Sequence, residues 1–158
     1  MKNNKSRIWV FVVAMALALT AMAQQRGSMS VAGNYAYATK HKQHGFALKF
    51  AYEINDHFRL EPEMMYFATN HDASTLDLTL NVHYLFPIVE HLRAYPTAGI
   101  NYSHWTYEGP DESRVGVVLG GGAEYWISAS WAIMFEQRFQ LVSHESQSLT
   151  SLGVRYAF

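Results

Sequence analysis

Apolar and polar side chains alternate with a period of two over most of the chain after its first 23 residues. The C-terminal segment is the clearest example, because Leu152, Val154, Tyr156 and Phe158 share one face while small or charged residues share the other. This period is typical of β-strands with one apolar face. The pattern predicts eight strands, within residues 29–38, 46–54, 58–66, 76–86, 92–105, 115–126, 131–141 and 151–158. Clusters of turn-forming residues separate these segments, so we expect antiparallel neighbours joined by short connections.

The volume of the side chains indicates which face points inward. The apolar face carries large rings throughout, namely Phe46, Phe50, Tyr52, Phe58, Tyr66, Tyr84, Phe86, Tyr102, Tyr125, Trp131, Phe135, Phe139, Tyr156 and Phe158. An eight-stranded barrel is only just wide enough inside for its own side chains or one small ligand, so these rings would overfill it. We therefore predict an all-β fold, an eight-stranded antiparallel up-and-down transmembrane β-barrel with its apolar face toward lipid. A soluble sandwich or a lipocalin-like barrel is the alternative.

Aromatic residues concentrate near the ends of the predicted strands, as the interfacial girdles of a membrane barrel require. Tyr52, Phe58 and Phe158 belong to the expected periplasmic girdle, and Phe46 and Tyr66 belong to the outer one.

Two prolines interrupt the alternating pattern. Pro62 and Pro96 fall in the middle of predicted strands, where proline removes a hydrogen-bond donor from the ladder, so we expect a bulge or a local break at each.

The first 23 residues differ from the rest of the chain. Lys2, Lys5 and Arg7 precede an apolar run over residues 8–19, and small residues follow it up to Ala23. This is the pattern of a secretory signal peptide. The run is too short for a membrane-spanning helix, which takes about 20 apolar residues. We expect cleavage after Ala23, so that residues 1–23 are a signal peptide and residues 24–158 form one exported barrel domain.

Composition and charge narrow the class of protein further. The 158 residues include no cysteine, which excludes disulfide scaffolds, thiol catalysis and cysteine-based metal sites. The 12 Lys and Arg against 13 Asp and Glu provide no basic surface for nucleic acid. Charged residues make up 16% of the chain, below the roughly 25% usual for soluble domains. The low charge favours lipid as the environment of much of the surface.

The chain resembles the small outer-membrane β-barrel proteins, a porin-like group that includes the OmpA transmembrane domain, OmpX and OmpW. The resemblance rests on the signal peptide, the eight strands and the terminal pattern Leu152-x-Val154-x-Tyr156-x-Phe158. Residues 120–125 and 135–139 are similar to the sixth and seventh strands of that family. The resemblance implies a place in a Gram-negative outer membrane, in contact with its lipid and lipopolysaccharide. It also implies that Val154, Tyr156 and Phe158 form a signal for the barrel-assembly machinery. We expect a monomer, because a closed barrel has no free strand edges.

Charged residues on the inward face are the main candidates for function. The expected lumen holds the cations Lys49, Arg59, Arg93, Arg138 and Arg155 and the anions Glu53, Glu61, Glu63, Asp77, Glu124 and Glu136. Unpaired buried charges are costly, and the arginine fork suits carboxylates, so we predict that these groups pair into an ionic plug. The plug implies a closed barrel with a structural or surface-interaction role. A solvated lumen is the alternative, and it would suit a narrow channel or a conduit for a small apolar ligand, as in the OmpW-like branch.

Two further patterns suggest chemistry. His144-Glu145-Ser146 matches the His-x-Ser arrangement in which lipid A deacylases activate a serine, but a three-residue pattern in a predicted outer loop is weak support for an enzyme. His41, His44, His71, His104 and His144 fall at the predicted outer end, where several loops could hold zinc or copper. We expect these histidines to be solvated singly, and we predict no catalytic residue, no cofactor and no metal.

Overall fold

The computed structural model of the chain describes residues 28–40, 42–68, 74–106, 112–143 and 146–158. Its long strands are β1 (Ser28–Ala38), β2 (Gln43–Glu53), β3 (Phe58–Ala68), β4 (Ser74–Tyr84), β6 (Leu92–Thr106), β7 (Glu112–Trp126), β8 (Trp131–Val142) and β9 (Gln147–Ala157). A short strand, β5 (Phe86–Val89), separates β4 from β6 in the sequence. The predicted signal peptide and its cleavage site lie outside the described residues. No helix in the described part of the chain is long and apolar enough to cross a membrane.

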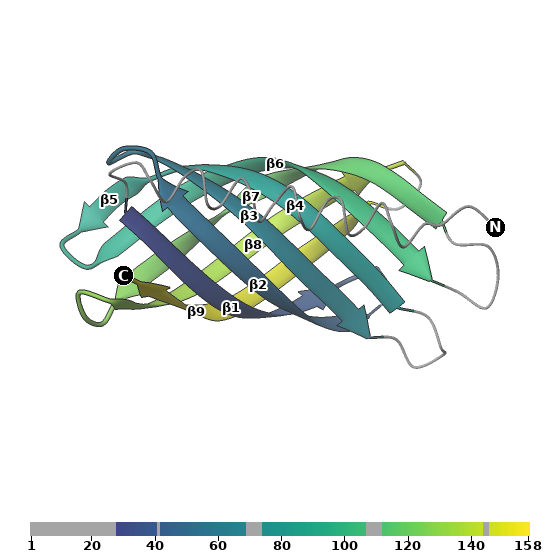
Figure 1. The fold of residues 1–158 in the computed structure, drawn as a ribbon, viewed down its shortest axis with the longest axis horizontal. Coiled ribbons are helices and arrows are strands. Elements are labelled where there is room, and N and C mark those ends of the chain that lie inside the picture. Colours follow the sequence, from purple (N-terminus) through teal and green to yellow (C-terminus); the bar gives the residue numbers. More distant parts are fainter. Residues whose placement is uncertain (1–27, 41, 69–73, 107–111, 144–145) are drawn as a thin grey trace.

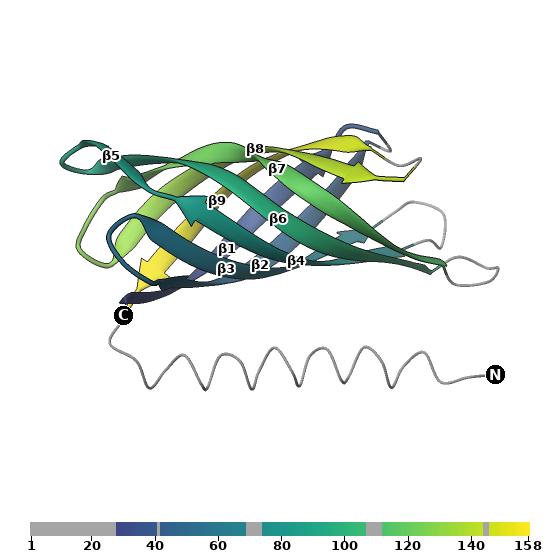
Figure 2. The same ribbon diagram turned by 90° about the horizontal axis from the view of Figure 1, so that it is seen from above.

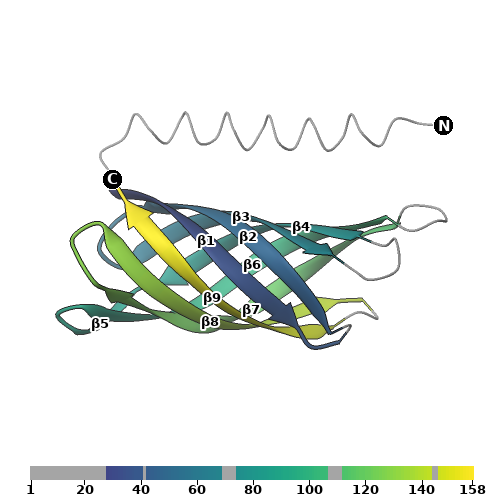
Figure 3. The same cartoon turned by 90° about the horizontal axis from the view of Figure 1, so that it is seen from below.

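The long strands form one closed antiparallel barrel (Figure 1). Neighbours follow the order β4-β3-β2-β1-β9-β8-β7-β6, and the pairing of β4 with β6 joins the two edges. Figure 2 shows β6 beside β4, and Figure 3 shows the last strand, β9, beside the first, β1. Every long strand therefore has a partner on both sides, which satisfies the backbone groups that lipid cannot. The predicted eight-stranded up-and-down barrel is confirmed.

The connections between strands define two ends of the barrel. The terminal end carries the C-terminus, β5 and the turns 54–57 and 127–130, and at the opposite, distal end β1, β3, β6 and β8 end and β2, β4, β7 and β9 begin (Figure 1). In one terminal turn, Asn55 Oδ1 accepts hydrogen bonds from the backbone N–H groups of His57 and Phe58, each at 2.9 Å. In another, Ser128 Oγ accepts from Trp131 N at 3.1 Å. Asn and Ser favour turns because they make such bonds to nearby backbone.

The outer wall of the barrel is apolar. Val115, Phe46 and Leu48 are among its most exposed side chains, at 70%, 69% and 60%. A soluble protein rarely exposes so continuous an apolar surface, whereas a membrane barrel presents one to lipid. At the terminal end the ring of Trp131 lies against that of Tyr156, with centroids 4.9 Å apart. The polar and apolar faces are therefore inverted relative to a soluble barrel, as the side-chain volumes predicted.

The two mid-strand prolines interrupt hydrogen-bonded ladders without shifting their register. The β2–β3 ladder has no pairs at residues 50–51, next to Pro62, but keeps the same register on both sides. On one side of Pro96, strand β6 pairs with β4 as far as Thr97. On the other side it pairs with β5 from Ala94, and the two pairings at these residues share one register. A local break without a bulge is what a missing N–H donor produces. A register shift occurs instead inside β5, between Pro87 and Val89.

Part of the inward face is apolar, which the alternation did not indicate. A buried cluster near the distal end, from β1, β2, β3 and β9, comprises Ala36, Ala38, Ala47, Met65, Phe67 and Leu149. Phe67 packs against Gly45, where an added Cβ would lie 2.7 Å from the ring. The distal part of the lumen is therefore filled partly by apolar packing, in addition to the charges that the sequence predicted.

Candidate functional site

A two-point ion pair crosses the lumen on its terminal side. Arg59 of β3 donates to Glu124 of β7 through Nη1 to Oε2 at 3.0 Å and through Nη2 to Oε1 at 2.7 Å. Arg59 Nη2 also donates to Glu53 Oε1 at 2.8 Å. The Arg59 and Glu124 side chains are fully buried. Two parallel N–H···O bonds are the strong and geometrically specific form of a charged pair, so this contact fixes β3 relative to β7.

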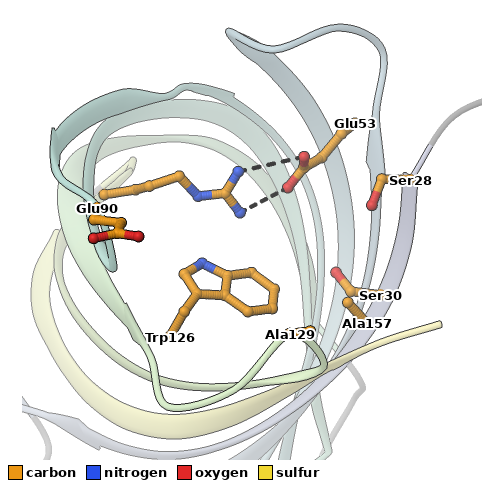
Figure 4. Close-up of a pocket in the computed structure, with 8 residues that line it drawn as sticks. Ser28, Ser30, Glu53, Glu90, Trp126, Ala129 and Ala157 are labelled. Carbon is orange, nitrogen blue, oxygen red and sulfur yellow. Dashed lines mark hydrogen bonds and ion pairs between the residues drawn. The ribbon is translucent and has the colours of Figure 1, made fainter.

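A cavity of about 300 Å³ opens at the terminal end of the lumen (Figure 4). Its lining includes Ser28, Glu53, Arg93 and Trp126. Arg93 donates to Glu53 Oε1 at 2.9 Å, and from Nε to Glu124 Oε1 at 2.7 Å. The Arg93 guanidinium also lies 5.1 Å from the centroid of the Trp126 ring. The Arg93 and Glu53 side chains are 22% and 18% exposed, and they separate the cavity from the fully buried pairs behind them.

Lys49 of β2 contacts three carboxylates in the middle of the lumen. Its Nζ lies 3.2 Å from Glu61 Oε1 and 3.1 Å from Glu63 Oε2, and it donates to Glu136 Oε2. All four side chains are buried. A lysine ammonium has three donors on one compact centre, which suits three separate acceptors better than a planar guanidinium does.

Two arginines connect these groups into one network. Arg155 Nη2 lies 2.5 Å from Glu61 Oε2, and its Nε lies 3.3 Å from Glu124 Oε2, which joins the terminal pairs to the middle of the lumen. Arg138 donates to Glu63 Oε1 at 2.9 Å. Ten residues on six strands are thus linked by ion pairs without a gap, and we call them the lumen network: Lys49, Glu53, Arg59, Glu61, Glu63, Arg93, Glu124, Glu136, Arg138 and Arg155.

Neutral side chains fill the space beside the lumen network. Tyr95 donates from its hydroxyl to Glu136 Oε1 at 2.9 Å, and its ring stacks on His83 with centroids 4.6 Å apart. Gly122 pairs with Tyr95 in the β6–β7 ladder, and a Cβ there would lie 2.8 Å from Tyr95 Cζ and 2.8 Å from Glu136 Cγ. This inward glycine makes room for a larger neighbour.

Asp77 departs from the predicted network. All the other charged residues expected in the lumen belong to the lumen network, but no ion pair among the described residues includes Asp77. Gln140 Nε2 instead donates to Asp77 Oδ2 at 3.0 Å. The physical reason is its level in the barrel, where the inward neighbours Asn101, Ser103 and Gln140 are buried amides and a hydroxyl. The alternation shows that these residues face inward, but not that the cations lie nearer the terminal end.

The lumen network neutralises charge and leaves little room for chemistry. Among the described residues, Glu61, His83 and Glu136 offer metal-ligand atoms within 4.8 Å of one another. Lys49 Nζ, however, contacts both Glu61 and Glu136, so an ammonium already occupies the position between these carboxylates. A catalytic metal needs an open coordination position, and a general base needs a carboxylate within reach of substrate. This buried cluster offers neither.

Of the residues that suggested an enzyme or a loop metal site, the structure describes His44, His104 and Ser146, near the distal end. His44 Nδ1 contacts the Tyr35 hydroxyl, and His104 Nδ1 lies 2.8 Å from Ser113 Oγ. His41, His71 and His144 lie outside the described residues, as does Glu145 of the His144-Glu145-Ser146 triplet. The hydroxyl of Ser146 donates to the carbonyl of Val142 at 3.5 Å. The described members therefore contact nearby polar groups.

The predicted C-terminal signal lies on the outer wall. Val154, Tyr156 and Phe158 are 46%, 38% and 66% exposed. They belong to the last strand and its end, at the seam where β9 pairs with β1 and β8. Their position leaves them accessible from the lipid side, and their role in assembly stays a prediction.

The closed barrel with an apolar wall and a charged interior defines a membrane-embedded β-barrel. The family model for the outer membrane protein beta-barrel domain matches residues 9–158. The chain belongs to this family, and it is a protein of the cell outer membrane that crosses it with β-strands. A search of curated protein sequences gave no match.

Solved outer-membrane barrels have the same fold. The N-terminal β-barrel domain of Pseudomonas aeruginosa OprF matches with a TM-score of 0.68 and 16% identity, over 84% of this chain and 100% of that domain. Neisserial surface protein A matches with a TM-score of 0.62 and 18% identity, over 84% of this chain and 97% of that chain. Ail, the attachment invasion locus protein of Yersinia pestis, gives 0.60 and 18% over the same shares. At these identities the likeness concerns the fold alone.

Proposed function

We propose that this protein is a non-conducting structural barrel of the outer membrane, whose lumen the lumen network holds closed. Its role is then in membrane integrity or in contacts at the cell surface through short loops. The observation that carries the proposal is the unbroken path of ion pairs from Arg93 at the terminal mouth to Arg138 deep in the barrel.

Burial makes this path a barrier. An ion moving through the lumen has to separate pairs such as Arg59–Glu124 and Arg155–Glu61, whose side chains are fully buried. Breaking a buried pair by removal of one partner costs about 3–5 kcal/mol. An eight-stranded barrel has no spare width around such a plug. Apolar packing of Met65 and Phe67 fills part of the distal lumen as well.

Conductance in planar lipid bilayers tests the proposal. We expect the purified, folded wild-type chain to give no current steps. The Arg59→Ser/Glu124→Ser double variant removes one cross-lumen pair without a net change of charge. We expect this variant to conduct. Its current steps would also show that the assay detects barrels inserted in the bilayer. The matched control is Glu112→Ser/Arg114→Ser, a partly exposed pair at the distal end, which we expect to stay silent. Steady openings of the wild type would overturn the proposal.

The alternative is a narrow channel or a conduit for a small apolar ligand. The cavity at the terminal end is the feature that favours it. Its lining includes Ser30, Glu53, Glu90 and Arg93, which are polar or charged and do not suit an apolar ligand. Arg93 and Glu53 also close it toward the barrel interior. We therefore favour the closed barrel.

We further propose that the chain is a monomer with both ends of the barrel domain on the periplasmic side, in contact with lipid and lipopolysaccharide through its aromatic wall. A closed barrel has no free strand edge, which supports the monomer.

We also propose that Val154, Tyr156 and Phe158 form the signal that the barrel-assembly machinery recognises. Phe158→Ala should lower the fraction of folded chain in outer membranes, measured by heat-modifiable gel mobility. Phe46→Ala, with a similarly exposed ring at the distal end, is the control and should fold normally.

A further inference from the structure

The positive charge outside the lumen is concentrated in one turn. After residue 27, every lysine and arginine of the sequence belongs to the lumen network or to the Arg114–Glu112 pair, except Lys40 and Lys42. Both lie in the turn between β1 and β2, and both are exposed. The sequences that connect β3 to β4, β6 to β7 and β8 to β9 contain acidic residues and no lysine or arginine. The β1–β2 turn is therefore the connection that attracts an anion.

Lys42 has a backbone conformation that does not favour its residue type. Its φ is 50°, in the left-handed region. Glycine and asparagine adopt this region with less strain than other residues do. Turn geometry therefore does not account for a lysine at this position, whereas a use for its charge does.

Aromatic rings cover the outer wall next to this turn. Tyr35 and Phe46 are direct partners in the β1–β2 ladder, and Phe46 pairs with Tyr66 of β3. Their side chains are 45%, 69% and 51% exposed. The rings of Tyr35 and Phe46 meet edge to face, with centroids 5.5 Å apart. We call Tyr35, Phe46 and Tyr66 the ring row, and Figure 3 shows two of its strands, β1 and β2, side by side as they approach the distal end.

The spacing along β2 puts the two lysines near the level of the lipid headgroups. Phe46 belongs to the aromatic girdle, which marks the boundary of the hydrocarbon. Residues 42 and 46 lie at most about 13 Å apart along an extended strand, or about 10 Å along the membrane normal at the usual strand tilt. The headgroup layer extends about 5–8 Å beyond the hydrocarbon on each side. A flexible lysine side chain can bend back over the remaining distance.

We propose that the β1–β2 turn and the ring row bind a phosphorylated glycolipid of the outer leaflet, with Lys40 and Lys42 contacting its phosphate and the ring row its acyl chains. The proposal rests on the proposed orientation, which places the distal end at the cell surface. Basic groups beside a membrane attract anionic headgroups. A soluble phosphate or an acidic polymer would meet the lysines alone, whereas the exposed rings beside them suit a ligand that also carries hydrocarbon. The inference is independent of whether the barrel conducts.

Binding of lipid A to the folded chain in detergent micelles, measured by thermophoresis, tests the site. We expect tighter binding of phosphorylated lipid A than of lipid A from which the phosphates have been removed. Lys40→Gln/Lys42→Gln should weaken binding of the phosphorylated form about 30-fold at low salt and leave that of the other form unchanged. The matched control is His57→Glu/His91→Glu, which makes the same change of net charge at exposed positions of the terminal end and should bind as the wild type does.

The ring row is tested separately from the lysines. Phe46→Ala should weaken binding of both forms of lipid A several-fold. Phe139→Ala truncates a ring of the outer wall on β8 that is 53% exposed, and it should leave binding unchanged. If Phe46→Ala has no effect, or if inorganic phosphate or an acidic polysaccharide binds as tightly as lipid A, the ligand is not a lipid and the proposal is overturned. Equal affinity for the two forms of lipid A also overturns it, as does an equal loss in the lysine and histidine variants.

The orientation on which the site depends can be measured independently, because the chain has no cysteine. In Lys40→Cys, a membrane-impermeant maleimide should label intact cells. Absence of labelling would place the distal end in the periplasm and overturn both the orientation and this inference. Labelling, together with wild-type binding of lipid A by Lys40→Gln/Lys42→Gln, would overturn the inference alone.

Discussion

Arg59 and Glu124 meet at two points across the lumen, at 3.0 and 2.7 Å, although 65 residues separate them in the chain. Glu124 also contacts Arg93 at 2.5 Å and Arg155 at 3.3 Å. Three cations from β3, β6 and β9 therefore depend on one buried carboxylate. The wall of the barrel is held together by backbone ladders, but this group ties opposite sides of the wall to each other.

Removal of the Glu124 charge should destabilise the barrel strongly. Glu124→Gln keeps the shape of the side chain but leaves three arginines short of a counter-charge, which should cost about 3–5 kcal/mol of unfolding free energy. Urea unfolding in lipid vesicles, followed by tryptophan fluorescence, measures it. Glu112→Gln breaks an exposed pair and should cost less than about 1 kcal/mol. Equal losses in the two variants would show that the network adds nothing to stability.

Arg138 and Glu63 should be energetically coupled, because they form a buried pair at 2.9 Å. In a double-mutant cycle of Arg138→Met and Glu63→Gln, the double variant should be more stable than the sum of the single losses predicts, by about 0.5–3 kcal/mol. Glu53 has no contact with Arg138 among the described ion pairs. The cycle of Arg138→Met with Glu53→Gln should therefore be additive within about 0.5 kcal/mol.

An extra methyl group should be tolerated on one face of the wall and not on the other. A Cβ at Gly122 would lie 2.7 Å from the carbonyl oxygen of Phe135 and 2.8 Å from Tyr95 Cζ, so Gly122→Ala should cost about 1–3 kcal/mol. A Cβ at Gly33 would meet nothing within 4 Å. Gly33→Ala should therefore change stability by less than about 0.5 kcal/mol. The midpoints of urea unfolding compare the two variants. A Gly122→Ala variant as stable as the wild type would mean that the lumen is packed more loosely than described.

The distal apolar cluster should contribute to stability through packing. Phe67 is 1% exposed, so Phe67→Ala should leave a cavity in the lumen and cost about 3–5 kcal/mol. Phe46 lies on the outer wall at 69% exposure, where lipid can fill the space of a truncated ring. Phe46→Ala should cost clearly less in the same unfolding assay. A larger loss at Phe46 than at Phe67 would contradict this account of the two faces.

Quenching by brominated lipid should distinguish the tryptophans by face. Trp131 is 50% exposed on the outer wall, whereas Trp126 lines the cavity at the mouth of the lumen. Lipid brominated near the headgroup should quench Trp131 strongly, so Trp131→Phe should remove much of the effect in vesicles. Trp126→Phe should retain it. Quenching that depends on Trp126 instead would reverse the assignment of inside and outside.

Local pairs within the lumen network follow from neighbouring strands. Glu53 and Arg59 are direct partners across the turn 54–57, and Lys49 and Glu63 are partners in the same ladder. Alternation puts all four side chains on the inward face, and the hairpin brings them together. These contacts could be predicted once the turn was placed, because strands joined by a short turn have little freedom in register.

Contacts across the lumen could not be predicted in this way. Arg155 with Glu61 and Arg138 with Glu63 are separated by 94 and 75 residues. Which side chains share a level of the barrel depends on strand tilt and stagger, which alternation does not encode. For the same reason the position of Asp77, beside the Gln140 amide and outside the ion pairs, came only from the structure.

The amino-acid sequence by itself determined the membrane barrel, because a period of two assigns every side chain to one of two faces and large rings do not fit inside eight strands. It also determined which charges lie inside. The tertiary structure decided how those charges pair, where apolar packing takes over and which carboxylate stays outside the ion pairs. These depend on distances across the closed barrel, and only closure with a particular tilt and stagger sets them.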